Sequence, residues 1–287
     1  MRNQKLCLAL MSPYGSARLN TEEEIRLIAK TGFEGFFCGW GNLDYLKECR
    51  RIAGETGMYF QSVHAPFGRC RDLWHGTKEA AQTAIDELTG CLEGCARTEV
   101  PIMVSHVYIG FEDYDLAPND FGRANYETVI RRAKELGVKI AFENTEGAEY
   151  LDAVMKIGEE YPDTVGFCWD TGHEMCYNYS EDMPGRYPGR LIATHINDNL
   201  GIRDYGGRTF WYDDLHLLPF DGVGDWEDIA RRLAVFDGPL TFELTTHSKP
   251  DRHENDKYAK LTPEEYLAEA YARACRVATL VQKAKKA

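Results

Sequence analysis

Short apolar segments alternate with longer segments of helical periodicity along the whole chain, and this alternation constrains the fold more than any other feature. Eight apolar segments predict strands: residues 5–12, 33–40, 59–66, 102–108, 139–145, 164–170, 191–198 and 240–246. Segments with a period of about 3.6 residues predict helices: residues 22–31, 43–56, 78–97, 121–136, 150–160, 226–236 and 263–284. The strand–helix unit recurs roughly every 33 residues, and eight such units predict an α/β fold of the (β/α)8 TIM barrel type.

The ends of several predicted helices carry the expected capping residues. Gly32, Gly57 and Gly137 each follow a predicted helix, and glycine ends a helix in the left-handed conformation at the lowest steric cost. Thr262 and Pro263 start the last helix as an N-cap and a first-turn proline. These residues support the predicted borders between helices and strands.

No low-complexity linker divides the chain of 287 residues, so we expect residues 1–287 to form a single barrel domain. One long loop, residues 199–225, is rich in Gly, Asp and Arg, and loops of this length in compact domains are usually functional. The longest apolar runs are shorter than the roughly 18 residues of a membrane span, so no membrane partner is expected. The apolar segment 6–11 fits a first strand better than a signal peptide.

Charge and cysteine usage restrict the possible partners and location. The net charge of −13 disfavours nucleic acid as a partner, because phosphate neutralisation supplies most non-specific affinity for polyanions. The nine cysteines include no Cys-x-x-Cys pair and lie mostly within predicted strands and helices. Buried thiols of this kind, without a disulfide framework, predict a cytoplasmic protein.

Ligand-type side chains stand near the C-terminal ends of six consecutive predicted strands, which is where chemistry collects in this fold. They are His64, His106, Glu143, Asp170, His195 and Glu243, with His173 just past Asp170, and the long loop adds Asp214 and His216. Each of them alone fits a helix cap, a salt bridge or a structural histidine. Together they predict a metal centre, because buried carboxylates are costly unless they are paired or bind a cation.

Glu143, Asp170, His195 and Glu243 form the predicted metal-binding set. Three carboxylates and one imidazole make a hard, oxygen-rich site that suits Mn²⁺, Mg²⁺ or Co²⁺ and tolerates Zn²⁺ or Fe²⁺. We expect one divalent ion, with Mn²⁺ preferred. Open positions on such an ion would accept two oxygens of a hydroxy-ketone and would stabilise an enediolate.

Five short motifs carry a resemblance to a known family. They are His64-Ala65-Pro66, Phe142-Glu143-Asn144, Asp170-Thr171-Gly172-His173, His195-Ile196-Asn197-Asp198-Asn199, and Asp214-Leu215-His216 followed by Gly222-Val223-Gly224-Asp225-Trp226. With these motifs the chain resembles, over essentially its whole length, the xylose isomerase-like TIM barrel superfamily and in particular its sugar phosphate isomerase/epimerase group. The motifs are specific for the superfamily and not for one substrate.

The resemblance implies a metal-dependent isomerase or epimerase that transfers a proton next to the carbonyl of a keto-sugar or polyol. Glu143, Asp170, His195 and Glu243 match the family's single metal site, and in its ketose 3-epimerases the two glutamates are also the acid/base pair. This gives Glu143 and Glu243 catalytic roles. Homo-oligomers are usual in the family, so a homo-oligomer is expected here.

The resemblance also implies a set of substrate-binding residues. His173 matches a position that contacts substrate oxygens. Many sugar isomerase-like members also have the residues found here as His64, His106, Asp214 and His216 and use them to bind substrate. In the long loop, Arg203 and Arg208 are either a clamp for a phosphate or carboxylate or ordinary solvated charges.

Three alternatives remain open at this point. The nine ligand-type residues complete the pattern of the trinuclear-zinc endonucleases that cleave at abasic DNA sites, although the charge of −13 argues against DNA binding. A lyase of the same superfamily, such as an inosose dehydratase or a C-glycoside-cleaving subunit, would use the same metal and bases. A non-catalytic sugar-binding barrel is the third, and the intact ligand set argues against it.

Overall fold

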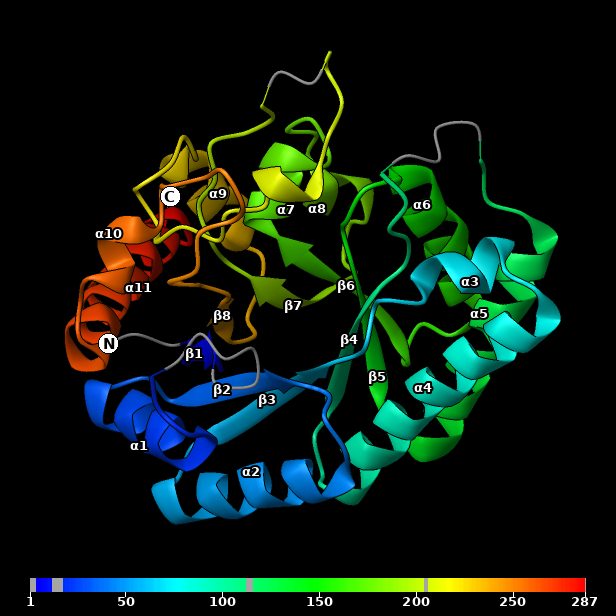
Figure 1. Cartoon of the computed structure of the whole chain (residues 1–287), viewed down its shortest axis with the longest axis horizontal. Helices are drawn as coiled ribbons and strands as arrows, with labels where there is room; N and C mark the ends of the chain where they lie inside the picture. Colours follow the sequence, from blue (N-terminus) through cyan, green and yellow to red (C-terminus); the bar gives the residue numbers. More distant parts are fainter. Residues whose placement is uncertain (1–3, 12–17, 112–115, 204–205, 287) are drawn as a thin grey trace.

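Eight parallel strands form a nearly closed barrel surrounded by helices, as Figure 1 shows, so the predicted TIM barrel is confirmed. The computed structural model describes residues 4–11, 18–111, 116–203 and 206–286. The strands are β1 (Leu6–Ala9), β2 (Gly35–Gly39), β3 (Tyr59–His64), β4 (Ile102–His106), β5 (Lys139–Glu143), β6 (Val165–Asp170), β7 (Leu191–His195) and β8 (Leu240–Phe242). From β1 to β7 each strand pairs with the next strand in the chain, and β1 also pairs with β8.

The barrel closes between β7 and β8 through a few backbone contacts just past the end of β7. Ile196 forms a parallel bridge with Phe242. Its N–H donates to the Thr241 carbonyl at 2.8 Å, and its carbonyl accepts from the Glu243 N–H at 3.2 Å. These bonds fix Glu243 beside the end of β7, which brings it close to His195.

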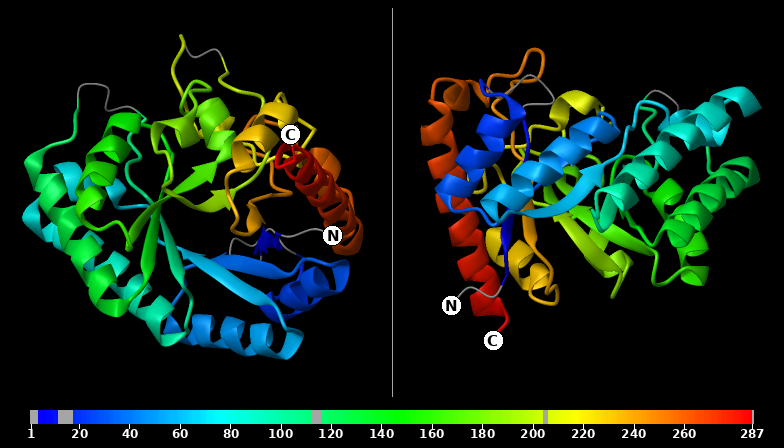
Figure 2. Two further views of the ribbon diagram at one scale, coloured as in Figure 1. Left: turned by 180° about the vertical axis from the view of Figure 1, so that it is seen from behind. Right: turned by 90° about the horizontal axis from the view of Figure 1, so that it is seen from below.

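The helices lie on the outside of the barrel in both views of Figure 2. They are α1 (Thr21–Thr31), α2 (Leu43–Thr56), α3 (Cys70–His75), α4 (Lys78–Arg97), α5 (Asp120–Leu136), α6 (Ala148–Ile157), α7 (Thr171–Cys176), α8 (Met183–Arg186), α9 (Trp226–Leu233), α10 (Asp256–Ala259) and α11 (Pro263–Ala284). Short 3-10 turns, Gly158–Glu160 and Trp211–Asp213, complete the described elements. The long α11 packs against both α9 and α1, which closes the ring of helices.

The three glycine-capped helix ends and the start of the last helix agree with the structure. Gly32, Gly57 and Gly137 follow α1, α2 and α5 with φ angles of 116°, 69° and 68°, in the left-handed region that only glycine adopts readily. Thr262 caps α11, and its hydroxyl and the Glu265 carboxylate form a reciprocal capping box.

Several boundaries differ from the sequence-based prediction. Strands β3, β4, β5, β7 and β8 end two to four residues before the predicted positions, and α6 and α9 end at Ile157 and Leu233 rather than at residues 160 and 236. Strand β8 ends at Phe242 rather than at residue 246, so Glu243 lies just after the strand. The end of the first predicted strand, residue 12, lies outside the described residues. The short helices α3, α7, α8 and α10 were not predicted, because segments of four to six residues are too short to show a helical period.

The inward-facing positions of the strands explain why the polar residues meet at one end. Successive side chains of a strand point to opposite faces, so every second residue faces the barrel interior. Small apolar side chains at such positions, among them Val104, Ala141, Cys168 and Ala193, fill the interior. The next inward positions, two residues further along the same four strands, are His106, Glu143, Asp170 and His195. The ligand-type residues therefore form the top layer of the barrel interior.

All nine cysteines are free thiols, and eight of them are buried, as the sequence predicted. Within the described part of the chain, no helix has the length and apolar character needed to cross a membrane.

Candidate metal centre and active site

Four side chains meet at the C-terminal mouth of the barrel, and we call Glu143, Asp170, His195 and Glu243 the inner set. One ligand atom from each of them lies within 4.8 Å of the corresponding atoms of the others. His195 Nδ1 is 3.0 Å from Glu143 Oε1 and 2.9 Å from Glu243 Oε2. Glu143, Asp170 and His195 are fully buried. The structure thus brings together the four residues that the sequence predicted as metal ligands.

The side chain of His195 is held by packing as well as by charge. Its ring stacks on Phe37 from β2, with the ring centres 4.5 Å apart and the planes within 9° of each other. Its Nε2 is buried and has no hydrogen-bond partner among the described residues. Buried polar atoms are rarely left unpaired, so this nitrogen can take part in binding a ligand.

Asn197 orients Asp170 within the inner set. Its Nδ2 lies 3.1 Å and 2.9 Å from the two Asp170 carboxylate oxygens. The Asp170 Oδ1 also accepts from the His173 backbone N–H at 2.7 Å, which makes Asp170 the N-cap of α7. An added Cβ at Gly172 would collide with Asn197 Oδ1, so glycine is required there. These contacts explain the spacing of the Asp-Thr-Gly-His and His-x-Asn motifs.

A second group of ligand-type atoms adjoins the inner set through Glu143. Its other carboxylate oxygen, Oε2, lies 3.3 Å from His64 Nε2 and 3.4 Å from His106 Nε2. The two imidazole Nε2 atoms are 3.2 Å apart. His64, His106 and Glu143 therefore form a three-residue cluster in which a second cation could be held.

A third group lies further out, and we call His173, Asp214 and His216 the outer cluster. Asp214 Oδ1 is 2.9 Å from His216 Nε2 and 3.5 Å from His173 Nε2. His173 comes from the first turn of α7, whereas Asp214 and His216 come from the loop between β7 and α9. His216 has a φ of 46°, which is uncommon for a residue other than glycine and places its ring on this cluster.

The long loop that carries the outer cluster is fixed by Asp198, which is fully buried. Its carboxylate accepts from the N–H groups of Asn199 and Phe220 at 2.9 Å, from Gly224 N at 3.0 Å and from Trp226 Nε1 at 3.0 Å. These four donors tie the start of the loop, its middle and the first residue of α9 to one side chain. The Gly-x-Gly-Asp-Trp motif therefore serves to close this loop on Asp198.

The pKa values of the buried groups indicate that the carboxylates of the inner set need a positively charged partner. Burial raises the pKa of Asp170 to about 6 and lowers the pKa of His106 to about 4. Burial also disfavours the charged form of His195, yet the Glu143 and Glu243 carboxylates hold its pKa well above the ordinary value. Without another cation, a proton on His195 balances these carboxylates, so metal binding would release that proton.

A pocket of about 300 Å³ opens onto these groups. Among its lining residues are His64, His106, His173, Asp214, His216 and Glu243. Glu143 and Asp170 lie beneath this surface. All but one of the residues predicted to bind substrate thus face a single pocket, and the exception is Arg203.

Arg203 lies away from the pocket. It is exposed, and its guanidinium donates to the Asp251 carbonyl at 3.4 Å. The pocket has a different cation, Lys249, together with the aromatic ring of Phe67. Neither residue was singled out from the sequence, because Lys249 follows β8 in an irregular loop and Phe67 follows β3, with no motif to mark them.

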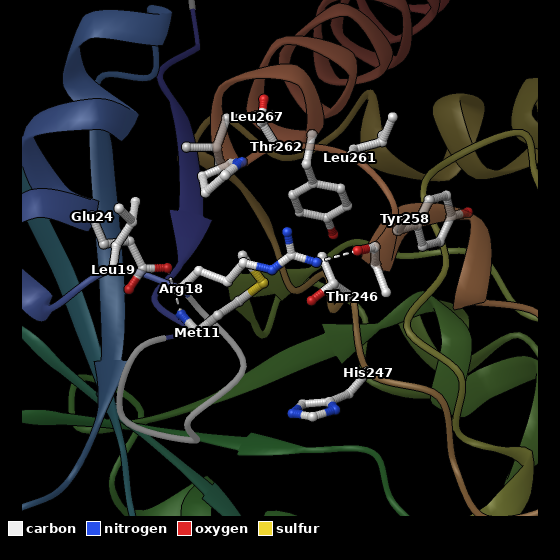
Figure 3. A pocket seen from close by; sticks show the side chains of 13 residues that line it. Met11, Arg18, Leu19, Glu24, Thr246, His247, Tyr258, Leu261, Thr262 and Leu267 are labelled. Carbon is white, nitrogen blue, oxygen red and sulfur yellow. Dashed lines mark hydrogen bonds between the residues drawn. The ribbon is translucent and has the colours of Figure 1, made fainter.

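A second cavity of about 270 Å³ adjoins the first and shares Met11 and His247 with it. Figure 3 shows Arg18 extending across this cavity, where its guanidinium donates to the Ala259 carbonyl. Glu24 accepts from the Met11 N–H at 2.7 Å at one wall. The cavity contains no member of the inner set or the outer cluster, so we take the first pocket as the candidate substrate site.

The model of the xylose isomerase-like TIM barrel family matches residues 25–271. The chain therefore belongs to this family, as the motifs predicted. A curated relative, the uncharacterized protein y4fM of Sinorhizobium fredii (strain NBRC 101917 / NGR234), is 29% identical over an alignment of 266 positions that covers 82% of this chain and 79% of the relative.

Solved structures with the same fold include named sugar epimerases. D-psicose 3-epimerase from Clostridium cellulolyticum H10, solved with D-tagatose, superposes with a TM-score of 0.71 at 16% identity, over 96% of this chain and 99% of that chain. The IolI protein, solved with a bound zinc atom, gives a TM-score of 0.68 at 19% identity, over 97% and 98% of the two chains. A fusion of a xylose isomerase-like TIM barrel with 4-hydroxyphenylpyruvate dioxygenase matches over 94% of this chain but only 42% of its own length, with a TM-score of 0.70 at 15% identity. At identities of 15% to 19%, these matches show similarity of fold only.

Proposed function

We propose that this protein is a divalent-metal-dependent isomerase or epimerase that transfers a proton next to the carbonyl of a keto-sugar or polyol. The observation that carries the proposal is the inner set, in which three carboxylates and one imidazole converge at the base of an open pocket. The epimerase neighbours of the same fold support this reaction class. A small-molecule substrate and a homo-oligomeric assembly belong to the same proposal.

The inner set fits a divalent cation. Its buried carboxylates need a positive partner, and among the described residues no lysine or arginine forms an ion pair with Glu143, Asp170 or Glu243. Oxygen-rich ligands of this kind favour Mn²⁺, with Mg²⁺, Co²⁺ or Zn²⁺ as alternatives. A divalent ion bound there would polarise the substrate carbonyl and lower the pKa of the neighbouring C–H group.

Glu243 and Glu143 are the proposed acid/base pair. Glu243 lines the pocket, so its carboxylate can take the proton from the carbon next to the carbonyl while the electron pair moves to the carbonyl oxygen. Glu143 is fully buried, and its Oε2 lies against His64 and His106, which do line the pocket. In an epimerase, Glu143 would return a proton to the opposite face of the same carbon, and this would invert the configuration of that carbon. His64, His106, His173 and His216 would bind the substrate hydroxyls.

The test compares the wild type with Glu143→Gln and Glu243→Gln, using a panel of keto-sugars and inososes with added Mn²⁺ in D₂O. We expect both variants to fold and to lose turnover by about 100-fold or more, because glutamine cannot accept the proton. Glu227→Gln, an exposed carboxylate on α9, serves as the matched control and should keep full activity. Metal content is measured in every variant, which separates loss of the ion from loss of proton transfer.

The same panel identifies the reaction. Deuterium in the recovered substrate or its epimer supports the proposal, whereas loss of a β-hydroxyl and formation of an alkene would identify a lyase. Full activity of either variant would remove that glutamate from the mechanism. Turnover without any deuterium exchange, together with an unchanged rate after removal of the metal, would contradict the proposed function.

A second candidate function is the trinuclear-zinc endonuclease, and a specific observation favours it. Among the further ligand clusters of the described residues, two bring new histidines beside the inner set, one with His64 and His106 and one with His173, Asp214 and His216. Three zinc ions per chain together with cleavage of an abasic oligonucleotide would establish this alternative. About one ion per chain and no cleavage is the result expected from the isomerase proposal.

A further inference from the structure

The outer cluster holds two imidazole rings against one carboxylate. The Nδ1 of His173 lies 2.9 Å from the Asn144 carbonyl, and the Nδ1 of His216 lies 3.1 Å from the Glu243 carbonyl. A carbonyl oxygen can only accept, so each Nδ1 carries a hydrogen and Nε2 is the only ring nitrogen that could bind a metal ion. Both Nε2 atoms face the Asp214 carboxylate, which accepts a hydrogen bond from a protonated Nε2. A metal ion at this place would have to replace the hydrogen on each Nε2 and share the Asp214 carboxylate.

The protein supplies a cation at this place from its own chain. The Lys249 ammonium lies 3.3 Å from Asp214 Oδ2, and its side chain is about three-quarters buried. It also lies over the ring of Trp211, with the nitrogen 5.6 Å from the ring centre. Lys249 lies six positions after Glu243, in the loop that follows β8, so one loop contributes to the inner set and reaches the outer cluster.

The neighbouring cluster of His64, His106 and Glu143 provides an internal contrast. The Nδ1 of His64 lies 2.8 Å from the Ala65 carbonyl, so Nε2 is again the ring nitrogen that faces a carboxylate. Within the described part of the chain, no lysine or arginine forms an ion pair with Glu143. The two clusters have similar ligand chemistry, but only the outer one contains a fixed positive charge.

We propose that Lys249 takes the place of a metal ion in the outer cluster and keeps divalent cations out of it. Asp214 and Lys249 together have no net charge, so a metal ion would meet a carboxylate that is already neutralised and two imidazoles whose Nε2 hydrogens it would have to replace. The ion would also be repelled by the ammonium group a few ångströms away. The proposal rests on the proposed function in one respect, because it assumes that the inner set is the site that holds the metal.

The experiment counts metal ions and does not use activity. Metal-free wild type and Lys249→Met are titrated with Zn²⁺ by calorimetry, and bound metal is measured after equilibrium dialysis. We expect Lys249→Met to gain one ion per chain, at a site that binds at least roughly 100-fold more weakly in the wild type. Lys257→Met is the matched control, since Lys257 pairs with Asp221 on the surface, and it should leave the count unchanged.

The Asp214→Asn substitution, alone and combined with Lys249→Met, locates the gained ion. Asp214→Asn should leave the metal content of the wild type unchanged, but combined with Lys249→Met it should remove the gained ion. Lys249→Gln repeats the measurement with a polar replacement, in case the methionine disturbs the loop. The proposal is overturned if neither Lys249 variant gains an ion, or if Asp214→Asn alone removes an ion from the wild type. A separate measurement tests the proposed function. If the inner set did not hold the metal ion, Asp170→Asn would leave the metal content unchanged.

Discussion

The inner set and the outer cluster have similar ligand types but are supported by different parts of the fold. Three members of the inner set are the last residues of β5, β6 and β7, and the fourth, Glu243, directly follows β8. The members of the outer cluster come from α7 and from the loop after β7. Hydrogen bonds between strands fix the positions of the first group, whereas Asp198 and a few loop contacts fix the second.

This difference shows how one barrel can hold the inner set in fixed positions on its strands while the loop residues around it are free to change. The strand register pairs Asp170 with His195 and His106 with Glu143, so these side chains are placed by the barrel itself. Loop residues are placed by local contacts that can change without loss of the barrel. We therefore expect the inner set to bind the metal, and the outer cluster to affect substrate recognition.

The largest expected effect separates the two groups by metal affinity. Asp170→Asn removes a buried carboxylate ligand and should weaken Mn²⁺ binding by at least about 100-fold, because support residues alone contribute 10- to 100-fold at such sites. Asp214→Asn removes a carboxylate of similar burial in the outer cluster and should leave Mn²⁺ affinity within about threefold of wild type while raising KM. Calorimetric titration of both variants with Mn²⁺ measures the difference.

Equal losses of metal affinity in the two variants would show that the two groups act as one polynuclear centre. That result would also favour the endonuclease alternative. Thermal unfolding of both variants in the absence of metal provides the control for general destabilisation.

A smaller effect is expected from two buried asparagines that support the two groups. The Asn197 amide donates to Asp170, and the Asn255 amide donates to the carbonyls of Leu215 and Thr245 at 3.0 Å each. Asn197→Ala should weaken Mn²⁺ binding by roughly 10- to 100-fold, since residues that orient metal ligands have effects of this size. Asn255→Ala should leave Mn²⁺ affinity unchanged, because it fixes only the loops around the outer cluster.

Each alanine variant removes one buried amide, so the pair controls for the general cost of the substitution. If Asn255→Ala weakened Mn²⁺ binding as much as Asn197→Ala, the loops would have to take part in holding the ion. Metal affinity is again measured by titration, and circular dichroism verifies that both variants are folded.

The inner set was predictable from the sequence, because its residues are placed by a repeating strand pattern. Glu143, Asp170 and His195 end apolar segments, and the (β/α)8 arrangement brings the ends of parallel strands to one rim. The eight strands and the glycine caps of α1, α2 and α5 were predictable for the same reason, since each has a local signature.

The surroundings of the outer cluster were only partly predictable. The sequence singled out His173, Asp214 and His216, but it gave no signal for Lys249, because loops have no periodicity from which the position of a side chain follows. The same limit applies to α7, which consists of six residues and starts directly after β6. The expectation that Arg203 binds an anionic group of the substrate stays a prediction.

The smallest expected effect concerns this last residue. Arg203 is exposed and is not among the residues that line the pocket, so Arg203→Ala should change KM by less than about twofold. Steady-state kinetics with a phosphorylated and an unphosphorylated keto-sugar measure the effect, with Arg131→Ala, an exposed arginine on α5, as the control. An increase in KM of about tenfold for the phosphorylated sugar alone would mean that the loop moves over the pocket when substrate binds. The loop would then add an anion-binding group that belongs neither to the inner set nor to the outer cluster.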